Sequence, residues 1–269
     1  MRKSYRMTMI LLSAALLCGC SSFGKEKVPV MDFQEKVEWK APDPAAGKKP
    51  RILFVGNSHT FYNNLSGMFV NIIDNLGHKG DVHELSSGYY SLRQFADTAD
   101  RGGAVLDQTL SDQKWDFVIL QENTSNALSS VAEKEMFPFA RTLDEKIKAS
   151  GAQTIFLMTW TPKDGIKKMK REEAQSDIAS CYMTIADELG SLLIPAGAGF
   201  LRCSQLYPEI ELWNQDGQHP SPEGSYLAAC LAYAVIYQES PEDCSYTGDL
   251  DQDVARKLQG VAADMIFTD

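Results

Sequence analysis

From Arg51 onward, short apolar runs alternate with segments in which apolar residues recur at helical spacing. Nearly continuous apolar runs predict strands buried on both faces, and a less apolar run predicts a weaker strand at 81–86. The four apolar runs are residues 52–55, 116–120, 154–158 and 192–194. Helical spacing predicts helices at 68–76, 132–149, 178–189, 222–235 and 250–265. Strands that alternate with helices indicate an α/β fold, a largely parallel sheet with helices on both faces.

Local signals place some of the helix ends. Pro138 breaks or kinks the helix predicted at 132–149, and Gly151 closes it. Ser221 followed by Pro222 is a typical cap and first residue of the helix predicted at 222–235. One α/β domain from residue 48 to residue 269 is therefore the simplest organisation.

Ligands of open α/β sheets bind beyond the carboxyl ends of the strands, so the loops that follow the apolar runs are the candidate site. The first run is followed by Gly-Asn-Ser-His-Thr at 56–60, and a later run by Gln-Glu-Asn at 121–123. A Gly/Pro-rich loop at 212–221 leads into the helix predicted at Pro222.

These loops hold the residue types that acyl transfer requires: a nucleophile, a base and a group that orients the base. Asp216 and His219 are three residues apart, so the carboxylate can reach one imidazole nitrogen and leave the other to face Ser58. A tetrahedral oxyanion also needs hydrogen-bond donors. Backbone N–H groups near Ser58 and Gly88 and the side chain of Asn123 are the candidates.

Gly-Asn-Ser-His-Thr at 56–60 resembles the first block of the SGNH/GDSL hydrolases, and Asp216-x-x-His219 resembles their last block. The longer phrase at 52–64 resembles a branch of that superfamily found in lipoproteins of Gram-negative anaerobes. The resemblance implies a flavodoxin-like three-layer sandwich around a mostly parallel five-stranded sheet. It also implies that Ser58 is the nucleophile, that His219 is the general base and then acid, and that Asp216 orients His219. Such enzymes hydrolyse esters without a metal or cofactor, and many remove acetyl groups from carbohydrates.

The two middle blocks of the family match less well. Gly88 is the match for the glycine whose N–H serves the oxyanion. The third block is G-x-N-D, whereas this chain has Gln121-Glu122-Asn123-Thr124, so Asn123 falls on the family's asparagine and Gln121 is an alternative amide donor. The missing glycine and aspartate put the oxyanion hole in doubt. A glycan-binding protein with the same fold and no catalysis is therefore the alternative function.

Three further side chains near these loops have open interpretations. His59 is expected to form part of the pocket wall rather than to act as a second base. Trp160 and Trp213 either line the cleft, where they would stack on sugars, or pack in the core. The histidines lack the spacing of zinc ligands, so no metal site is expected.

The first residues are typical of a bacterial lipoprotein signal. Arg2, Lys3 and Arg6 precede an apolar run that is too short to span a bilayer comfortably, and Leu17-Cys18-Gly19-Cys20 resembles a lipobox. That resemblance implies cleavage after Gly19, a lipid on Cys20, and anchoring in the cell envelope, with Ser21 favouring the outer membrane. An ordinary secretory signal or an uncleaved anchor is the alternative. Residues 20–47 are then a lipidated N-terminus and flexible tether.

Charge and cysteines refine this picture. The chain of 269 residues has 36 acidic and 26 basic side chains, which argues against a nucleic-acid partner. Removing residues 1–19 takes away three positive charges, so the formal charge of -10 becomes -13 and a basic membrane-binding patch is not expected. The four cysteines that remain beside Cys20 are Cys181, Cys203, Cys230 and Cys244. Export permits a disulfide among them, but the sequence does not choose a pair.

Overall fold

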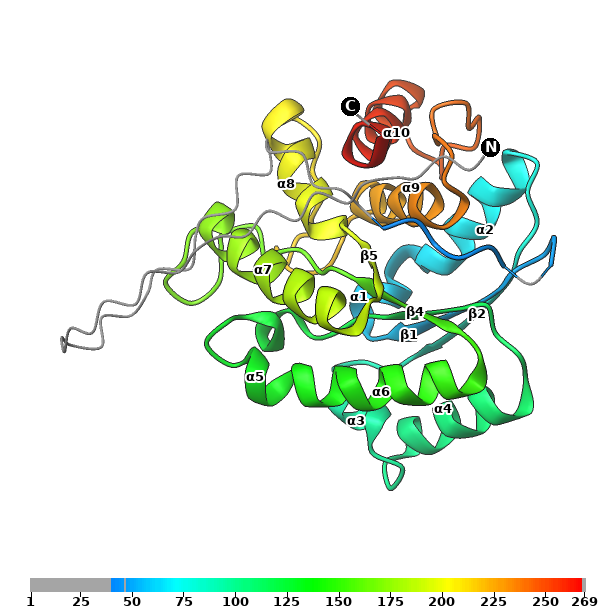
Figure 1. Ribbon diagram of the computed structural model, residues 1–269. Helices are drawn as coiled ribbons and strands as arrows, with labels where there is room; N and C mark the ends of the chain where they lie inside the picture. The colour runs from blue at the N-terminus through cyan, green and yellow to red at the C-terminus, as the bar shows by residue number, and fades with distance from the viewer. Residues whose placement is uncertain (1–39, 46, 268–269) are drawn as a thin grey trace, which may run out of the picture.

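A five-stranded parallel sheet forms the centre of the computed structural model, which describes residues 40–45 and 47–267 (Figure 1). The strand order is β2-β1-β3-β4-β5, and all four neighbouring pairs are parallel. The strands are β1 (Arg51–Gly56), β2 (Asp81–Ser86), β3 (Phe117–Leu120), β4 (Gln153–Leu157) and β5 (Leu192–Ile194). This order confirms the predicted α/β class and the flavodoxin-like sheet.

Each central strand sends alternate side chains into two separate cores. Ile52 and Phe54 of β1 join one core, and Leu53 and Val55 join the other. A strand buried on both faces has no polar positions, which is why β1 and β3 are continuous apolar runs in the sequence. The sheet is therefore the middle layer of three.

Helices cover both faces of this sheet (Figure 1). The first core is closed by α2 (Leu65–Asn75), α8 (Ala196–Leu206) and α9 (Pro222–Tyr237), with α10 (Gln252–Phe267) packed on α8 and α9. The second is closed by α3 (Leu92–Ala96), α4 (Arg101–Asp112), α5 (Ala132–Glu135), α6 (Phe137–Ser150) and α7 (Arg171–Leu189). The short elements α1 (Ser58–Phe61), η1 (Tyr62–Asn64) and η2 (Thr124–Ala127) lie in loops that follow β1 and β3.

The segment predicted as one helix at 132–149 is two helices. Pro138 lies in the first turn of α6, where its missing N–H breaks no intrahelical hydrogen bond, so α5 ends before it. Gly151 ends α6 in the left-handed conformation, with φ of 91°. Ser221 caps α9 by accepting a hydrogen bond from the Gly224 N–H, as its position before Pro222 predicts.

The four cysteines of the domain are all free and buried, so no disulfide forms among them in this structure. The predicted signal peptide at 1–19 and the predicted lipid carrier Cys20 lie outside the described residues. Among the described residues, no helix has the length and apolar character needed to cross a membrane. Within the segment predicted as a tether, Asp43 exchanges two hydrogen bonds with the Gln153 side chain, so this short stretch lies on the domain.

Candidate active site

Ser58 begins α1 directly beyond the carboxyl end of β1, where the chain turns sharply. Asn57 caps this helix by accepting the His59 N–H, and its own N–H donates to Oε1 of Gln121 at 2.8 Å. Gly56 is required before the turn, because a Cβ there would lie 2.4 Å from Oγ1 of Thr60 and 2.6 Å from Oε1 of Gln121. This close packing fixes Ser58 at the edge of the sheet.

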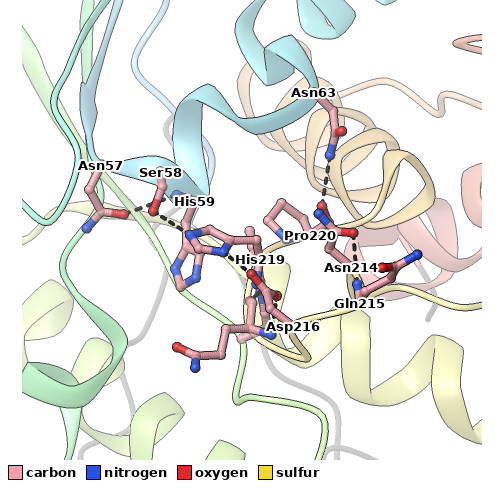
Figure 2. A network of polar contacts seen from close by, with 11 residues as sticks. Asn57, Ser58, His59, Asn63, Asn214, Gln215, Asp216, His219 and Pro220 are labelled. Carbon is pink, nitrogen blue, oxygen red and sulfur yellow. Dashed lines mark hydrogen bonds and ion pairs between the residues drawn. The ribbon is translucent and has the colours of Figure 1, made fainter.

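Asp216 and His219 lie in a tight loop before α9. Trp213 and Pro220 form an isolated antiparallel bridge, and the Asn214 N–H donates to the His219 carbonyl at 2.8 Å. Gly217 has φ of 66°, a conformation that glycine adopts without steric cost. The loop thereby folds back on itself and directs His219 towards Ser58, with the Asp216 carboxylate on the far side of the imidazole (Figure 2).

Ser58, His219 and Asp216 form a continuous hydrogen-bonded relay (Figure 2). His219 Nε2 lies 2.9 Å from Oγ of Ser58, and Nδ1 lies 2.5 Å from Oδ2 of Asp216. The second carboxylate oxygen of Asp216 accepts the backbone N–H groups of Gln218 and His219. Burial alone raises the pKa of Asp216, but the His219 ring and these two N–H groups lower it to about 2. Asp216 is therefore ionised at neutral pH and favours the tautomer with the proton on Nδ1.

Two aromatic rings contact the imidazole of His219. Tyr62 stacks on it with ring centroids 4.2 Å apart and an angle of 9° between the planes, while His59 meets it edge-on at 5.7 Å. Burial lowers the pKa of His59 to about 4, with a further contribution from His219, so His59 is neutral at pH 7. The sequence did not single out Tyr62, although its position four residues after Ser58 places it on the same turn.

Contacts from three other segments hold the Asp216–His219 loop in place. Trp160 donates its indole N–H to the Gln218 carbonyl, the Lys163 N–H donates to the Gly217 carbonyl, and Asn63 Nδ2 donates to the Pro220 carbonyl (Figure 2 for Asn63). Trp160 and Trp213 are both buried, and Trp160 stacks on Phe200 at 4.3 Å. Between the two open interpretations, the structure therefore selects core packing over sugar stacking for these tryptophans.

Three donors without a partner among the described residues lie in the loops after β1, β2 and β3. They are the N–H of Ser58, the N–H of Gly88 and the side-chain NH₂ of Asn123, whose Oδ1 accepts from Ser125. The register pairs Gly56 with Ser86 and Val55 with Leu120, so these loops leave the same edge of the sheet side by side. This placement on one edge is what the oxyanion role predicted for Gly88 and Asn123 requires.

Gln121 is misplaced for the alternative role of amide donor to the oxyanion. It is fully buried, and its Oε1 accepts from the Asn57 N–H and Thr60 Oγ1. Its Nε2 donates to the Glu122 carbonyl at 2.6 Å. The side chain thus stabilises the turn that carries Ser58, and its amide is hydrogen-bonded inside the domain.

Glu122 is a buried carboxyl group beside the site that sequence reasoning passed over. It accepts the N–H groups of Leu92 and Asn123 and Nδ2 of Asn126, and so links the loop after β3 to the start of α3. Burial raises its pKa to about 8. The only sequence signal was an acidic residue placed two positions after a buried strand.

No group of three His, Cys, Asp or Glu side chains within 40–45 and 47–267 is arranged to hold a metal ion. A doubly covered parallel sheet with a Ser-His-Asp relay beyond its carboxyl edge is the architecture of a serine hydrolase.

Comparison with solved structures identifies the family within this class. A protein from Slackia heliotrinireducens assigned to the SGNH hydrolases is 30% identical, with a TM-score of 0.60, over 70% of this chain and 98% of that one. A DUF4886 family protein from Bacteroides uniformis shares the fold at 15% identity and a TM-score of 0.62, over 80% of this chain and 94% of that one. An acetylxylan esterase from Geobacillus stearothermophilus also shares the fold. It is 16% identical, with a TM-score of 0.53, over 72% of this chain and 96% of that one.

The chain belongs to the SGNH hydrolase superfamily, which confirms the family and the hydrolase class expected from the two sequence blocks. No protein-family model matches the sequence. No curated protein matches it either.

Proposed function

We propose that the protein is a serine esterase that hydrolyses small acyl esters, with acetyl groups on carbohydrate as its substrates. One observation carries the proposal: Ser58 Oγ, His219 and Asp216 are joined by two hydrogen bonds at the edge of the sheet. Membership of the SGNH hydrolases supports ester hydrolysis. The acetylxylan esterase among the proteins that share the fold supports the choice of an acetylated sugar.

The geometry defines the role of each group in the reaction. Because Nδ1–H of His219 donates to Asp216, the lone pair on Nε2 accepts the Ser58 proton while Oγ attacks the ester carbonyl carbon. The carbonyl oxygen becomes an oxyanion that the N–H groups of Ser58 and Gly88 and the Asn123 amide bind. His219 then protonates the leaving alcohol. Water then attacks the acyl group on Ser58 in the same way, with His219 again as the base. This second reaction releases the carboxylate and restores Ser58.

The proposed location is the bacterial cell envelope, with the chain anchored through lipid on Cys20. The resemblance of Leu17-Cys18-Gly19-Cys20 to a lipobox supports this proposal. Each acyl chain contributes about 0.8 kcal/mol per buried CH₂, so several chains anchor stably. Radiolabelled palmitate should label the wild-type chain in a Gram-negative host, and Cys20→Ala should abolish the label.

Hydrolysis of 4-nitrophenyl acetate by the full chain in mild detergent tests the proposed chemistry. Ser58→Ala should reduce kcat by at least about 10³-fold, because the residual rate over water comes from the oxyanion donors and binding alone. A fluorophosphonate probe should label the wild-type serine and fail to label this variant. Full activity in Ser58→Ala would show that Ser58 is not the nucleophile.

The competing proposal is a glycan-binding protein that keeps the fold without catalysis. The departure of the third block favours it, since Gln121 and Thr124 stand where the family has glycine and aspartate. Glycan binding without fluorophosphonate labelling would favour this alternative.

A further inference from the structure

Tyr89 combines two features that the fold itself does not explain. It is 92% exposed, the most exposed large apolar side chain in the described part of the chain. It also has φ of 64°, in the left-handed region where residues with a side chain are strained.

The strain arises from the turn in which Tyr89 lies. The Tyr90 N–H donates to the Ser87 carbonyl at 3.2 Å, so Gly88 and Tyr89 are the central residues of a β-turn. The positive φ of Tyr89 makes this a type II turn, whose third position favours glycine. A tyrosine at this position costs stability, and its exposed ring recovers almost none of that cost by packing.

Two hydrogen bonds attach this turn to the backbone on either side of the nucleophile. The Ser87 N–H donates to the Gly56 carbonyl at 3.1 Å, and Asn57 Nδ2 donates to the Tyr90 carbonyl at 2.8 Å. Tyr90 is itself held by its hydroxyl, which bonds to Asp100 at 2.9 Å. Tyr89 therefore belongs to a turn whose backbone is fixed next to the residues that precede Ser58.

We propose that Tyr89 is the platform on which the sugar ring of an acylated glycan stacks while its ester group lies at Ser58. This inference rests on the proposed esterase function. A sugar ring has a face of C–H groups that packs on the negative face of an aromatic ring, while its hydroxyl groups remain in water. Such a ligand requires an exposed ring whose backbone is held in place, which is how the turn presents Tyr89.

The test compares two substrates in the full chain purified in mild detergent. The substrates are 4-nitrophenyl acetate, which carries no sugar, and a panel of O-acetylated xylan, mannan and pectin oligosaccharides. Tyr89→Ala should lower the ratio of kcat/KM for the best oligosaccharide to kcat/KM for the aryl ester by about tenfold, mainly through KM. Tyr89→Trp should keep the ratio within about threefold of wild type.

Two controls separate stacking from a structural role. Val105→Ala removes an exposed apolar side chain from α4 and should leave the ratio unchanged. Tyr89→Gly removes both the ring and the strain, so it should lower the ratio like Tyr89→Ala while raising the Tm by about 2 °C. A lower Tm in Tyr89→Gly would assign the ring to the fold and overturn the proposal.

Other outcomes also decide the question. An unchanged ratio in Tyr89→Ala, or a wild-type enzyme that cleaves the aryl ester and none of the oligosaccharides, overturns the sugar platform while the esterase stands. Absence of both aryl-ester cleavage and fluorophosphonate labelling in the wild type would instead reject the esterase function itself.

Discussion

His219 is oriented by one residue of its own loop and by two residues that are distant in the sequence. Asp216 holds Nδ1, Ser58 lies at Nε2, and Tyr62 covers one face of the ring at 4.2 Å. A parallel aromatic face restricts rotation of the imidazole and attracts the positive charge that it gains during the reaction. Tyr62 is thus expected to position the base rather than to touch the substrate.

Replacing Tyr62 by leucine should lower kcat on 4-nitrophenyl acetate by about fivefold with little change in KM, because one stacked ring contributes roughly 1 kcal/mol. Tyr62→Phe keeps the aromatic face and should recover at least a third of the wild-type kcat. Steady-state kinetics of the two variants measure this difference. Equal losses in both variants would assign the effect to the hydroxyl group instead of the ring.

The role of Gly88 as an oxyanion donor can be tested by removing one hydrogen. Gly88 occupies the second position of a type II turn, where proline is favoured, so Gly88→Pro should remove the N–H and preserve the turn. We expect kcat to fall by about 10²–10³-fold, the usual effect of losing one such donor. Gly88→Ala is the matched control, because it keeps the N–H and its Cβ would meet nothing within 4 Å. If both variants keep full activity, the oxyanion donor lies elsewhere.

At the scale of elements, the sequence predicted the parts of the fold that have strong periodic patterns. All five strands and the helices α2, α9 and α10 form where apolar runs or helical spacing indicated. The pattern did not predict α3, α4 or α8. In α4 and α8 glycines obscure the helix: a Cβ on Gly103 would lie 2.0 Å from the Asp97 carbonyl, so this glycine serves close packing of the chain.

The same limit applies to the candidate site. Spacing alone paired Asp216 with His219, because three residues in a tight loop place both groups within reach. The two donors to Oε1 of Gln121 are 61 and 64 residues away, so no local pattern showed that its amide oxygen is used inside the Ser58 turn. Contacts of this kind depend on the register of the sheet, which a single sequence does not determine.

Glu122 connects two elements beside the site and should make the stability of the domain depend on pH. Burial raises its pKa to about 8 from an ordinary 4.5. The unfolded chain loses this proton at the lower value, so the contribution is complete below about pH 4.5 and is lost as the pH rises towards 8. Glu122→Gln cannot titrate. The variant should therefore be more stable relative to wild type at pH 8 than at pH 5. In other words, its free energy of unfolding minus that of wild type should be larger at pH 8.

Urea unfolding of both proteins at the two pH values measures this difference. Any pH-independent cost of fitting the amide among the Leu92, Asn123 and Asn126 donors cancels from the comparison. A relative stability that is the same at pH 5 and pH 8 would contradict a raised pKa for Glu122.

At the scale of the whole molecule, the two cores on either side of the sheet enclose every cysteine of the domain. Cys203, Cys230 and Cys244 belong to the core that contains α8 and α9, and Cys181 belongs to the opposite core. Burial raises the pKa of Cys181 and Cys203 to about 12 and that of Cys230 further. Since the thiolate is the reactive form, these cysteines should be inert in the folded protein.

Counting thiols therefore tests the fold and the proposed anchor together. A chain produced in a Gram-negative host should show no reaction with Ellman's reagent when native and four reactive thiols when unfolded in guanidinium, although the gene encodes six cysteines. The two missing thiols are Cys18, removed with the signal peptide, and Cys20, whose sulfur carries the lipid. The Cys20→Ala variant should also give four if it is cleaved at all, and it should lose the lipid mass. Six thiols would contradict cleavage. The four thiols of the domain plus that of Cys20 would contradict lipidation. Two thiols would indicate that export forms a disulfide in a core that the structure describes as reduced.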